Sequence, residues 1–201
     1  MATAFDTPLD QAALDQLFVE ARTFNHYTDR PVSEADLRAI WDLTKMGPTS
    51  ANQLPARFVW CTSPEAKERL ALCASDSNAD KIRAAPVSLV IGMDTEFHEY
   101  LPQLFPHADA KSWFDGNREL REASAFRNSS LQGGYFILAA RALGFGTGPM
   151  SGFDAGAVDK AFFADQPSVR TNFIATLGHG DTAKLHDRSP RPAFETFNRI
   201  V

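Results

Sequence analysis

The sequence predicts an α+β or mixed α/β fold in a single domain covering residues 1–201, with many helices and a few dispersed strands. Most of the chain carries apolar residues at helical spacing between capping signals. Only three short runs have the apolar, β-branched character of strands, and no internal repeat divides the chain. With 44% hydrophobic and 22% charged residues, a chain of this length can bury one sizeable core.

Two helices are predicted in the N-terminal part. The first should begin at Thr7-Pro8-Leu9-Asp10, where a threonine caps the helix and a proline takes its first position, and apolar residues follow at helical spacing to Ala21. Residues 33–36, Ser-Glu-Ala-Asp, signal the start of the second helix, which should end at Gly47-Pro48.

Strands are predicted at residues 57–61, 87–93 and 172–177. The middle one, Val-Ser-Leu-Val-Ile-Gly-Met, is apolar enough to be covered on both faces. A helix opening at Ser63-Pro64 should separate the first two strands, and a helix capped by Asp154 should precede the last.

The middle of the chain contains an excursion and a long helix. Residues 95–117 are aromatic and bear His and Pro, which favours a lid or a partner contact. Residues 118–143 predict one long helix whose second half is apolar on nearly every side and therefore buried. Because Gly133-Gly134 lowers helix propensity there, we expect something to pack closely against that point.

Composition excludes several classes of protein. The net charge of −5 argues against a nucleic-acid surface, and no apolar run approaches the roughly 20 residues of a membrane helix. The N-terminus lacks the features of a signal peptide, and two cysteines are too few for a disulfide framework. We therefore expect a soluble cytoplasmic protein that binds neither nucleic acid nor membranes, with Cys61 and Cys73 as buried small hydrophobic residues.

Common catalytic motifs are absent from the sequence. Residues 144–148, Gly-Phe-Gly-Thr-Gly, follow a helix rather than a strand, which argues against a dinucleotide-binding turn. The sequence has no P-loop, no nucleophile elbow and no HExxH motif. His98 stands between Glu96 and Glu99, but the pattern favours a solvated face over a metal site.

Four separated clusters remain: residues 21–27 (Ala-Arg-Thr-Phe-Asn-His-Tyr), 47–52 (Gly-Pro-Thr-Ser-Ala-Asn), 149–154 (Pro-Met-Ser-Gly-Phe-Asp) and 188–192 (Arg-Ser-Pro-Arg-Pro). Each alone is typical of a helix end, a turn, a helix cap or a basic tail. In this order they resemble the nitroreductase-like FMN (flavin mononucleotide) oxidoreductases, with motifs R-R-S-x-R-x-F/Y, P-S-S-x-N-x-Q-P and P-x-x-G-F-D. The second cluster, followed by Pro-Ala-Arg-Phe-Val-Trp at residues 55–60, is similar to the malonic semialdehyde reductases of bacterial uracil degradation.

The resemblance implies a central, mainly antiparallel sheet flanked by helices, in an intertwined homodimer with two FMN molecules at the subunit interface. The long apolar helix would form the dimer core, where Gly133-Gly134 suits a tight helix crossing. The excursion at residues 95–117 would correspond to a variable insertion that shapes the substrate channel.

The resemblance also implies which residues bind FMN. Arg22 and Thr23 fall in the phosphate motif, and Arg188 or Arg191 should approach the same phosphate, a role that suits the planar guanidinium fork. Asn78 and Lys81 match the pair at the pyrimidine edge and ribityl chain, and Asn25 lies near flavin N1 and O2. The remaining contacts are Pro48, Thr49, Ser50 and Asn52 from the partner subunit, Pro149 and Met150 against the ring, and the backbone N–H groups of Ser151 and Gly152 toward N5 and O4.

The chain departs from the family pattern at four positions. Ala21 replaces the first arginine of the motif, so one phosphate contact is lost or supplied elsewhere. Asn25 replaces a cation that would stabilise charge at N1 of the reduced flavin, so we expect a less positive flavin potential. Leu54 and Ala56, which follow the second cluster, replace the family's Gln and Trp. They change the shape of the site wall that this segment forms.

The function implied is an NAD(P)H-dependent flavin oxidoreductase, with NADPH or NADH as the hydride donor in a ping-pong reaction through flavin N5. Its expected substrate is malonic semialdehyde, reduced to 3-hydroxypropanoate in pyrimidine degradation. Arg118 and Arg121 are candidates for binding the substrate carboxylate. The sequence does not identify the proton donor, which could be water, the flavin ribityl hydroxyl or a side chain, and no metal is expected. Three alternatives stay open: a broad-specificity nitro- or quinone reductase, a non-catalytic flavin-binding module, and a structural dimer with a decayed site.

Overall fold

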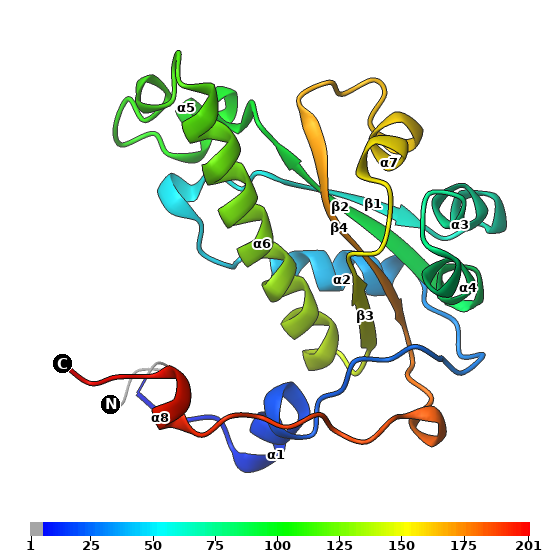
Figure 1. Ribbon diagram of the computed structural model, residues 1–201. Helices are drawn as coiled ribbons and strands as arrows, with labels where there is room; N and C mark the ends of the chain where they lie inside the picture. The colour runs from blue at the N-terminus through cyan, green and yellow to red at the C-terminus, as the bar shows by residue number, and fades with distance from the viewer. Residues whose placement is uncertain (1–5) are drawn as a thin grey trace.

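A computed structural model describes residues 6–201 and contains one four-stranded antiparallel sheet. The strands are β1 (Ala56–Cys61), β2 (Val87–Asp94), β3 (Gly146–Met150) and β4 (Val169–Gly178), in the order β1-β2-β4-β3. All three neighbouring pairs are antiparallel. The α+β fold class, with helices flanking a central sheet, is therefore confirmed (Figure 1).

Helices cover both faces of the sheet (Figure 1). The α-helices are α1 (Gln11–Leu14), α2 (Glu34–Thr44), α3 (Pro64–Ala71), α4 (Asp76–Ala84), α5 (Leu101–Leu104), α6 (Arg118–Ala142), α7 (Ala155–Phe162) and α8 (Phe194–Phe197). Short irregular helical turns are η1 (Asp15–Val19), η2 (Ser50–Asn52), η3 (Phe97–Tyr100), η4 (Lys111–Trp113) and η5 (Thr182–Lys184). One apolar core joins α2 and α6 to the sheet, and a second joins α3, α4 and α7 to its other face.

Strand β2 is buried on both faces, as its apolar run predicts. Leu89 and Ile91 point into the core shared with α2 and α6, whereas Val90 points into the core shared with α3, α4 and α7. Because side chains alternate along a strand, only a strand covered on both sides needs such a continuous apolar run.

Capping residues determine where several helices begin. Ser33 forms a capping box with Asp36 at the start of α2, and the Asp154 carboxylate accepts from the Ala157 N–H at the start of α7, both as predicted. The predicted start of the first helix is wrong. Asp10, not Thr7, caps α1, because its carboxylate oxygen accepts from the Ala13 N–H at 2.8 Å, which leaves Leu9 outside the helix.

Two elements, α4 and β3, carry little sequence signal and are not predicted. Helix α4 is mostly polar and buries only Ala79 and Ile82. Strand β3 contains glycines and a proline, which are rare within strands, but β4 is the one strand that pairs with it among the described residues, and Pro149 is exposed.

The excursion folds around a small core of its own. Phe97, Leu101, Ala110 and Phe114 pack together against Ala125 near the start of α6. Segment 95–117 is therefore an ordered subdomain of short helical turns next to the N-terminal half of α6 (Figure 1).

Helix α6 confirms the long predicted helix, but the expectation that its second half is buried on nearly every side is wrong within one chain. Leu131 is 47% exposed and Tyr135 37% exposed, whereas Phe136 on the opposite side is fully buried. Gly133 touches β4, since an added Cβ would lie 2.4 Å from Phe173 Cζ, but Gly134 has open space around it. Close packing is thus confirmed at Gly133 only, and α6 keeps an apolar outer face.

No helix among the described residues has both the length and the apolar character required to cross a membrane.

Replacing Gly133 by alanine should lower the free energy of unfolding by about 1–3 kcal/mol, because the new methyl group would overlap the Phe173 ring. Gly156 in α7 is the matched control: the nearest atom to its Cβ would be 3.4 Å away, so Gly156→Ala should be neutral or stabilising by up to about 1 kcal/mol. Urea unfolding monitored by circular dichroism compares the two. A Gly133→Ala variant as stable as the parent chain would contradict this packing of α6 on β4.

Candidate functional site

The first predicted cluster lies directly beside β3. Thr23 pairs with Thr147 in a parallel bridge, and the Phe24 N–H donates to the Thr147 carbonyl at 3.0 Å. Gly148 permits this approach, because an added Cβ would lie 2.4 Å from the Phe24 carbonyl oxygen. The segment that carries Arg22, Thr23 and Asn25 is therefore held along the outer edge of β3.

Asn78 and Lys81 meet the third cluster at the end of β3. The Asn78 side-chain amide donates to the Gly152 carbonyl at 3.1 Å, and Lys81 Nζ donates to Asn78 Oδ1 at 3.4 Å. The Ser75 N–H also donates to the Gly152 carbonyl. The turn at residues 149–152 is thus fixed by α4, and its Pro149, Ser151 and Gly152 are exposed while Met150 is half-buried.

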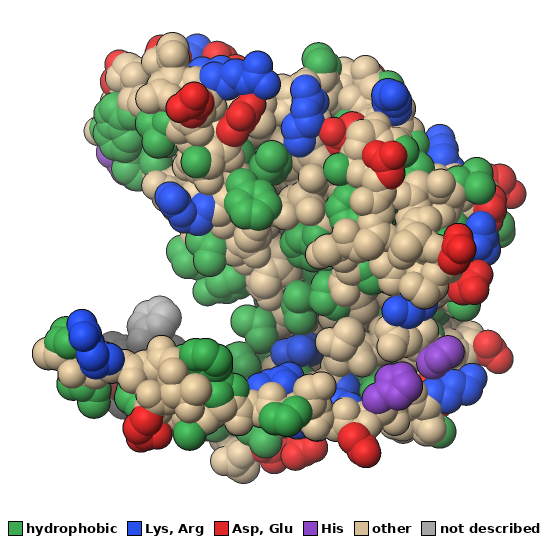
Figure 2. Space-filling view, viewed as in Figure 1, with side chains coloured by type: hydrophobic (Ala, Val, Ile, Leu, Met, Phe, Trp, Pro, Cys, Tyr) green, Lys and Arg blue, Asp and Glu red, His purple; other side chains and the backbone are tan. Residues whose placement is uncertain are grey.

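Arginines from three segments gather where the basic tail meets the first cluster. Arg22 donates to the His186 carbonyl, and Arg188 Nη2 donates to the Ala21 carbonyl at 3.2 Å. An arginine of each segment thus bonds to the backbone of the other. Arg141, near the end of α6, donates to the Leu17 carbonyl. Figure 2 shows Lys and Arg side chains gathered in the angle between the tail and the body.

These arginines favour an anion. Burial, and then the charge of Arg188, lower the pKa of Arg141, and its buried Nε has no hydrogen-bond partner among the described residues. A bound phosphate would relieve the repulsion between the guanidinium groups and accept from their remaining N–H groups. Arg141 is not predicted from the sequence, where its one signal is a cation in the last turn of the long helix. Arg191 lies further along the tail and donates to the carbonyls of Ser189 and Pro190.

The second cluster is not brought to this place within one chain. Ser50 N–H donates to Asn128 Oδ1 at 2.9 Å, and Asn52 Nδ2 donates to the Leu104 carbonyl at 2.8 Å. The Thr49 hydroxyl accepts from the Leu54 N–H. The loop that carries Pro48 is therefore fixed on α6, on the side away from α4 (Figure 1).

This loop has unusual backbone geometry. Ala51 and Asn52 both have φ of +49°, and Leu54 has φ of +40°, although none of them is glycine. A residue held in such a conformation costs on the order of 1–3 kcal/mol, and such residues cluster at functional sites. The contacts of Ser50 and Asn52 with neighbouring elements hold the strained loop in place.

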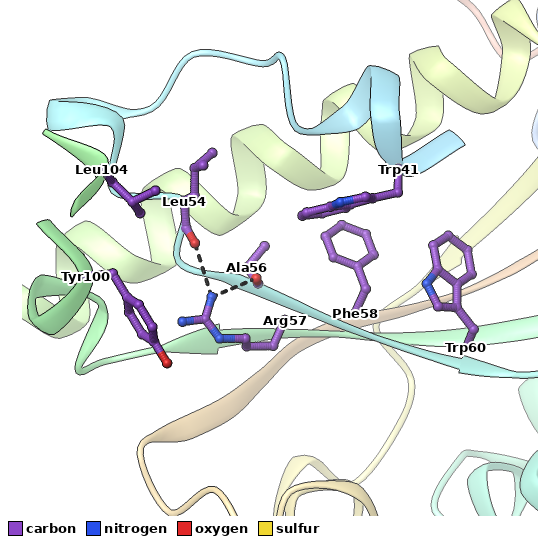
Figure 3. Close-up of a pocket in the computed structure, with 8 residues that line it drawn as sticks. All are labelled: Trp41, Leu54, Ala56, Arg57, Phe58, Trp60, Tyr100 and Leu104. Carbon is purple, nitrogen blue, oxygen red and sulfur yellow. Dashed lines mark hydrogen bonds between the residues drawn. The ribbon is translucent and has the colours of Figure 1, made fainter. Parts of the chain in front are cut away.

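An apolar hollow of about 510 Å³ lies beside this loop, between β1, α2 and the excursion (Figure 3). Its lining residues are Trp41, Leu54, Ala56, Arg57, Phe58, Trp60, Tyr100 and Leu104. The Arg57 guanidinium lies 5.2 Å from the Tyr100 ring centroid and pairs with Asp94 at 2.6 Å. Leu54 and Ala56, which depart from the family pattern, thus form part of its wall.

A second hollow of similar size continues the first along β1 and shares Trp41 and Trp60 with it. Val32, Leu37 and Thr62 contribute to its lining. The two hollows form a groove, called here the β1 groove, along a strand whose outer edge pairs with no other strand in residues 6–201.

Neither candidate for binding a substrate carboxylate lines the β1 groove. Arg118 pairs with Glu122 at 2.7 Å, and Arg121 pairs with Glu96 at 3.0 Å.

The predicted solvated face around His98 is wrong, since its side chain is only 4% exposed. Cys61 is buried as predicted, but Cys73 is only partly buried because its helix α3 has already ended.

Comparison with known proteins gives consistent matches over nearly the whole chain. The model of the Nitroreductase family matches residues 19–179. A protein from Burkholderia lata, named "Putative NADH dehydrogenase/NAD(P)H nitroreductase", is 59% identical over 194 residues, which cover 96% of this chain and 99% of that protein.

Solved structures share the fold at low sequence identity. A "putative nitroreductase" from Bacillus subtilis has a TM-score of 0.86 at 23% identity, and covers 96% of this chain and 100% of that one. A similarly titled protein from Exiguobacterium sibiricum, solved in complex with FMN, has a TM-score of 0.83 at 19% identity, covering 97% and 99%.

Inorganic phosphate should stabilise the ligand-free chain by binding among Arg22, Arg141 and Arg188. We expect a gain of about 1 kcal/mol at saturating phosphate, which corresponds to a rise in Tm of about 2–4 °C for a chain of this size. Arg188→Gln should remove most of the rise. Arg170→Gln, which also removes an exposed arginine bonded to backbone carbonyls, should not. Equal rises in both variants would contradict a phosphate site at this place.

Proposed function

The chain belongs to the nitroreductase family, an oxidoreductase family that uses FMN and NAD(P)H, and we propose that it reduces malonic semialdehyde to 3-hydroxypropanoate. The observation that carries the flavin site is the convergence of three separated clusters on β3. Arg22 comes from one side, Asn78 and Lys81 from a second, and Arg188 from a third.

The chemistry of the donor groups fits FMN. Arg22 and Arg188 would hold the phosphate together with the Thr23 hydroxyl. Arg141, near the end of α6, would add a further positive charge next to Arg188. Burial first, and then the charge of Arg188, lower the pKa of Arg141, and a phosphate dianion would compensate both effects by pairing with the guanidinium.

The rest of the cofactor would lie along α4 and the turn after β3. Asn78 and Lys81 carry the amide and ammonium groups suited to the pyrimidine edge and the ribityl chain. Gly152 leaves no room for a side chain, because an added Cβ would lie 2.7 Å from Asn78 Nδ2. The exposed turn at residues 149–152 can therefore present its backbone N–H groups to a flat ring.

FMN, when bound, supplies the hydride chemistry, so the chain needs to bind, orient and shield the reactants rather than provide a nucleophile. Arg22, Arg188 and Lys81 would fix the position of the cofactor. The strained loop around Ala51 would reach the ring from a second subunit, since it lies too far from α4 within its own chain to complete the same site.

Several uncovered surfaces support the proposed homodimer. Helix α6 exposes the large apolar side chains of Phe126, Leu131 and Tyr135. The C-terminal arm, residues 188–201, stands away from the body (Figure 2) and exposes the apolar side chains Phe194, Phe197, Ile200 and Val201. We propose that the arm of one subunit covers the β1 groove of the other, because an unpaired apolar strand edge favours the addition of an extended segment.

The substrate proposal rests on the resemblance of residues 47–60 to malonic semialdehyde reductases. A nitro- or quinone reductase is the second candidate. It is favoured by the name of the Burkholderia lata relative, "Putative NADH dehydrogenase/NAD(P)H nitroreductase".

Visible absorbance of the FMN-loaded protein tests the function directly. Anaerobic NADPH should bleach the flavin bands, and malonic semialdehyde should restore them within catalytic turnover. Arg22→Gln should weaken FMN binding at least about tenfold through its lost phosphate contact, whereas Arg170→Gln should not. Bands that return only with nitroaromatics or quinones would select the second candidate, and a colourless protein that FMN cannot restore would refute the flavin site.

Phe197→Ser should weaken the dimer, because Phe197 is 78% exposed in one chain and would be buried in the partner's β1 groove. Two such losses per dimer, each about 1.5–3 kcal/mol, raise the dimer dissociation constant at least about 100-fold. Leu72→Ser is the matched control, since Leu72 is 75% exposed on a different surface. Sedimentation velocity at several concentrations measures both, and identical behaviour of the two variants would contradict docking of the arm.

A further inference from the structure

His98 is a buried histidine enclosed by acidic side chains. Its side chain is 4% exposed, and its Nδ1 has no hydrogen-bond partner among the described residues. Glu96 Oε2 lies 3.7 Å from Nδ1, while Glu99 Oε1 and Asp115 Oδ1 lie 3.7 and 3.5 Å from Nε2. A buried imidazole with an unsatisfied nitrogen is costly, so a missing partner is indicated.

Neighbouring cations orient the two glutamates toward this ring. Arg121 pairs with Glu96 Oε1 at 3.0 Å, and Lys111 pairs with Glu99 Oε2 at 2.6 Å. In each carboxylate, one oxygen therefore pairs with a cation and the other oxygen faces His98. Outer partners of this kind orient the ligands of metal sites.

The spacing suits a shared metal ion better than direct hydrogen bonds. Separations of 3.5–3.7 Å exceed hydrogen-bond length. One oxygen from each glutamate and one ring nitrogen all lie within 4.8 Å of one another. Ligands about 2.1 Å from a tetrahedral ion stand about 3.4 Å apart, so an ion bound to Nδ1 beside Glu96 requires the exposed Glu99 carboxylate to move over from the Nε2 side of the ring.

We propose that Glu96, His98 and Glu99 bind one divalent transition-metal ion, with Zn²⁺ as the preferred ion. Imidazole nitrogen and carboxylate oxygen are both zinc ligands, and water can complete the coordination. Asp115 adds negative charge at the same place from the far end of the excursion. The ion has a structural role, because its two carboxylate ligands are also paired with Lys111 further along the excursion and with Arg121 of α6.

The site also bears on the β1 groove, since Tyr100 and Leu104 follow Glu99 within two short turns and line the hollow. Ion binding should therefore hold this wall in place. The proposal does not use any residue of the proposed flavin site, because Glu96, His98 and Glu99 are not among its contacts.

Isothermal titration of tag-free, chelator-treated protein with ZnCl₂ tests the site, and Co²⁺ provides a second reading through its visible absorption in tetrahedral geometry. We expect one ion per chain and a rise in Tm with Zn²⁺. Glu99→Gln should weaken binding at least tenfold, and because Glu99 is 55% exposed this variant should still fold. Asp109→Asn, which removes an acidic charge from the same excursion without touching His98, is the matched control.

His98→Gln should abolish the cobalt absorption, with folding checked by circular dichroism. Absence of saturable Zn²⁺ binding would overturn the proposal. So would equal affinity in the parent chain, Glu99→Gln and Asp109→Asn. If the NMR signal of His98 responds to pH but not to Zn²⁺, the carboxylates hold only a protonated imidazole and the metal site is refuted.

Discussion

The close approach of residues 22–27 to the glycine-bearing strand β3 is the constraint on which the site depends. Phe24 fits among three glycines, because a Cβ on Gly146 or Gly180 would lie within 2.5 Å of its ring and a Cβ on Gly148 would meet its carbonyl oxygen. Tyr27 secures the same segment through a 2.7 Å hydrogen bond with Thr176, and burial raises the pKa of its phenol. This backbone packing, rather than any charged contact, sets where Arg22 and Thr23 stand.

The site further depends on segments that carry little fold information of their own. Helix α4 buries only two side chains, but it positions Asn78 and Lys81 against Gly152. The tail after β4 is mostly exposed, but the bond from Arg188 to Ala21 ties it to the first cluster. Loosely packed elements around a rigid sheet are where binding groups are usually found.

Local signals predicted much of the fold, and long-range contacts explain the rest. Ser33 and Asp154 act through their own neighbours, so their caps could be read from sequence. Strand β3 could not, since only pairing with β4 makes Gly-Thr-Gly-Pro-Met a strand. For the same reason Asn78 and Lys81 were found through family resemblance, and the burial of His98 arises from a small core assembled across the excursion.

The uncovered edge of β1 has a consequence for how the chain is made. On a ribosome, Ala56–Cys61 emerges long before residues 188–201, which we propose as its cover. Because the proposed cover comes from another copy, each newly made chain would carry a bare apolar edge until it meets a partner. Slow or dilute synthesis would prolong that interval, and aggregation through strand edges competes with assembly during it.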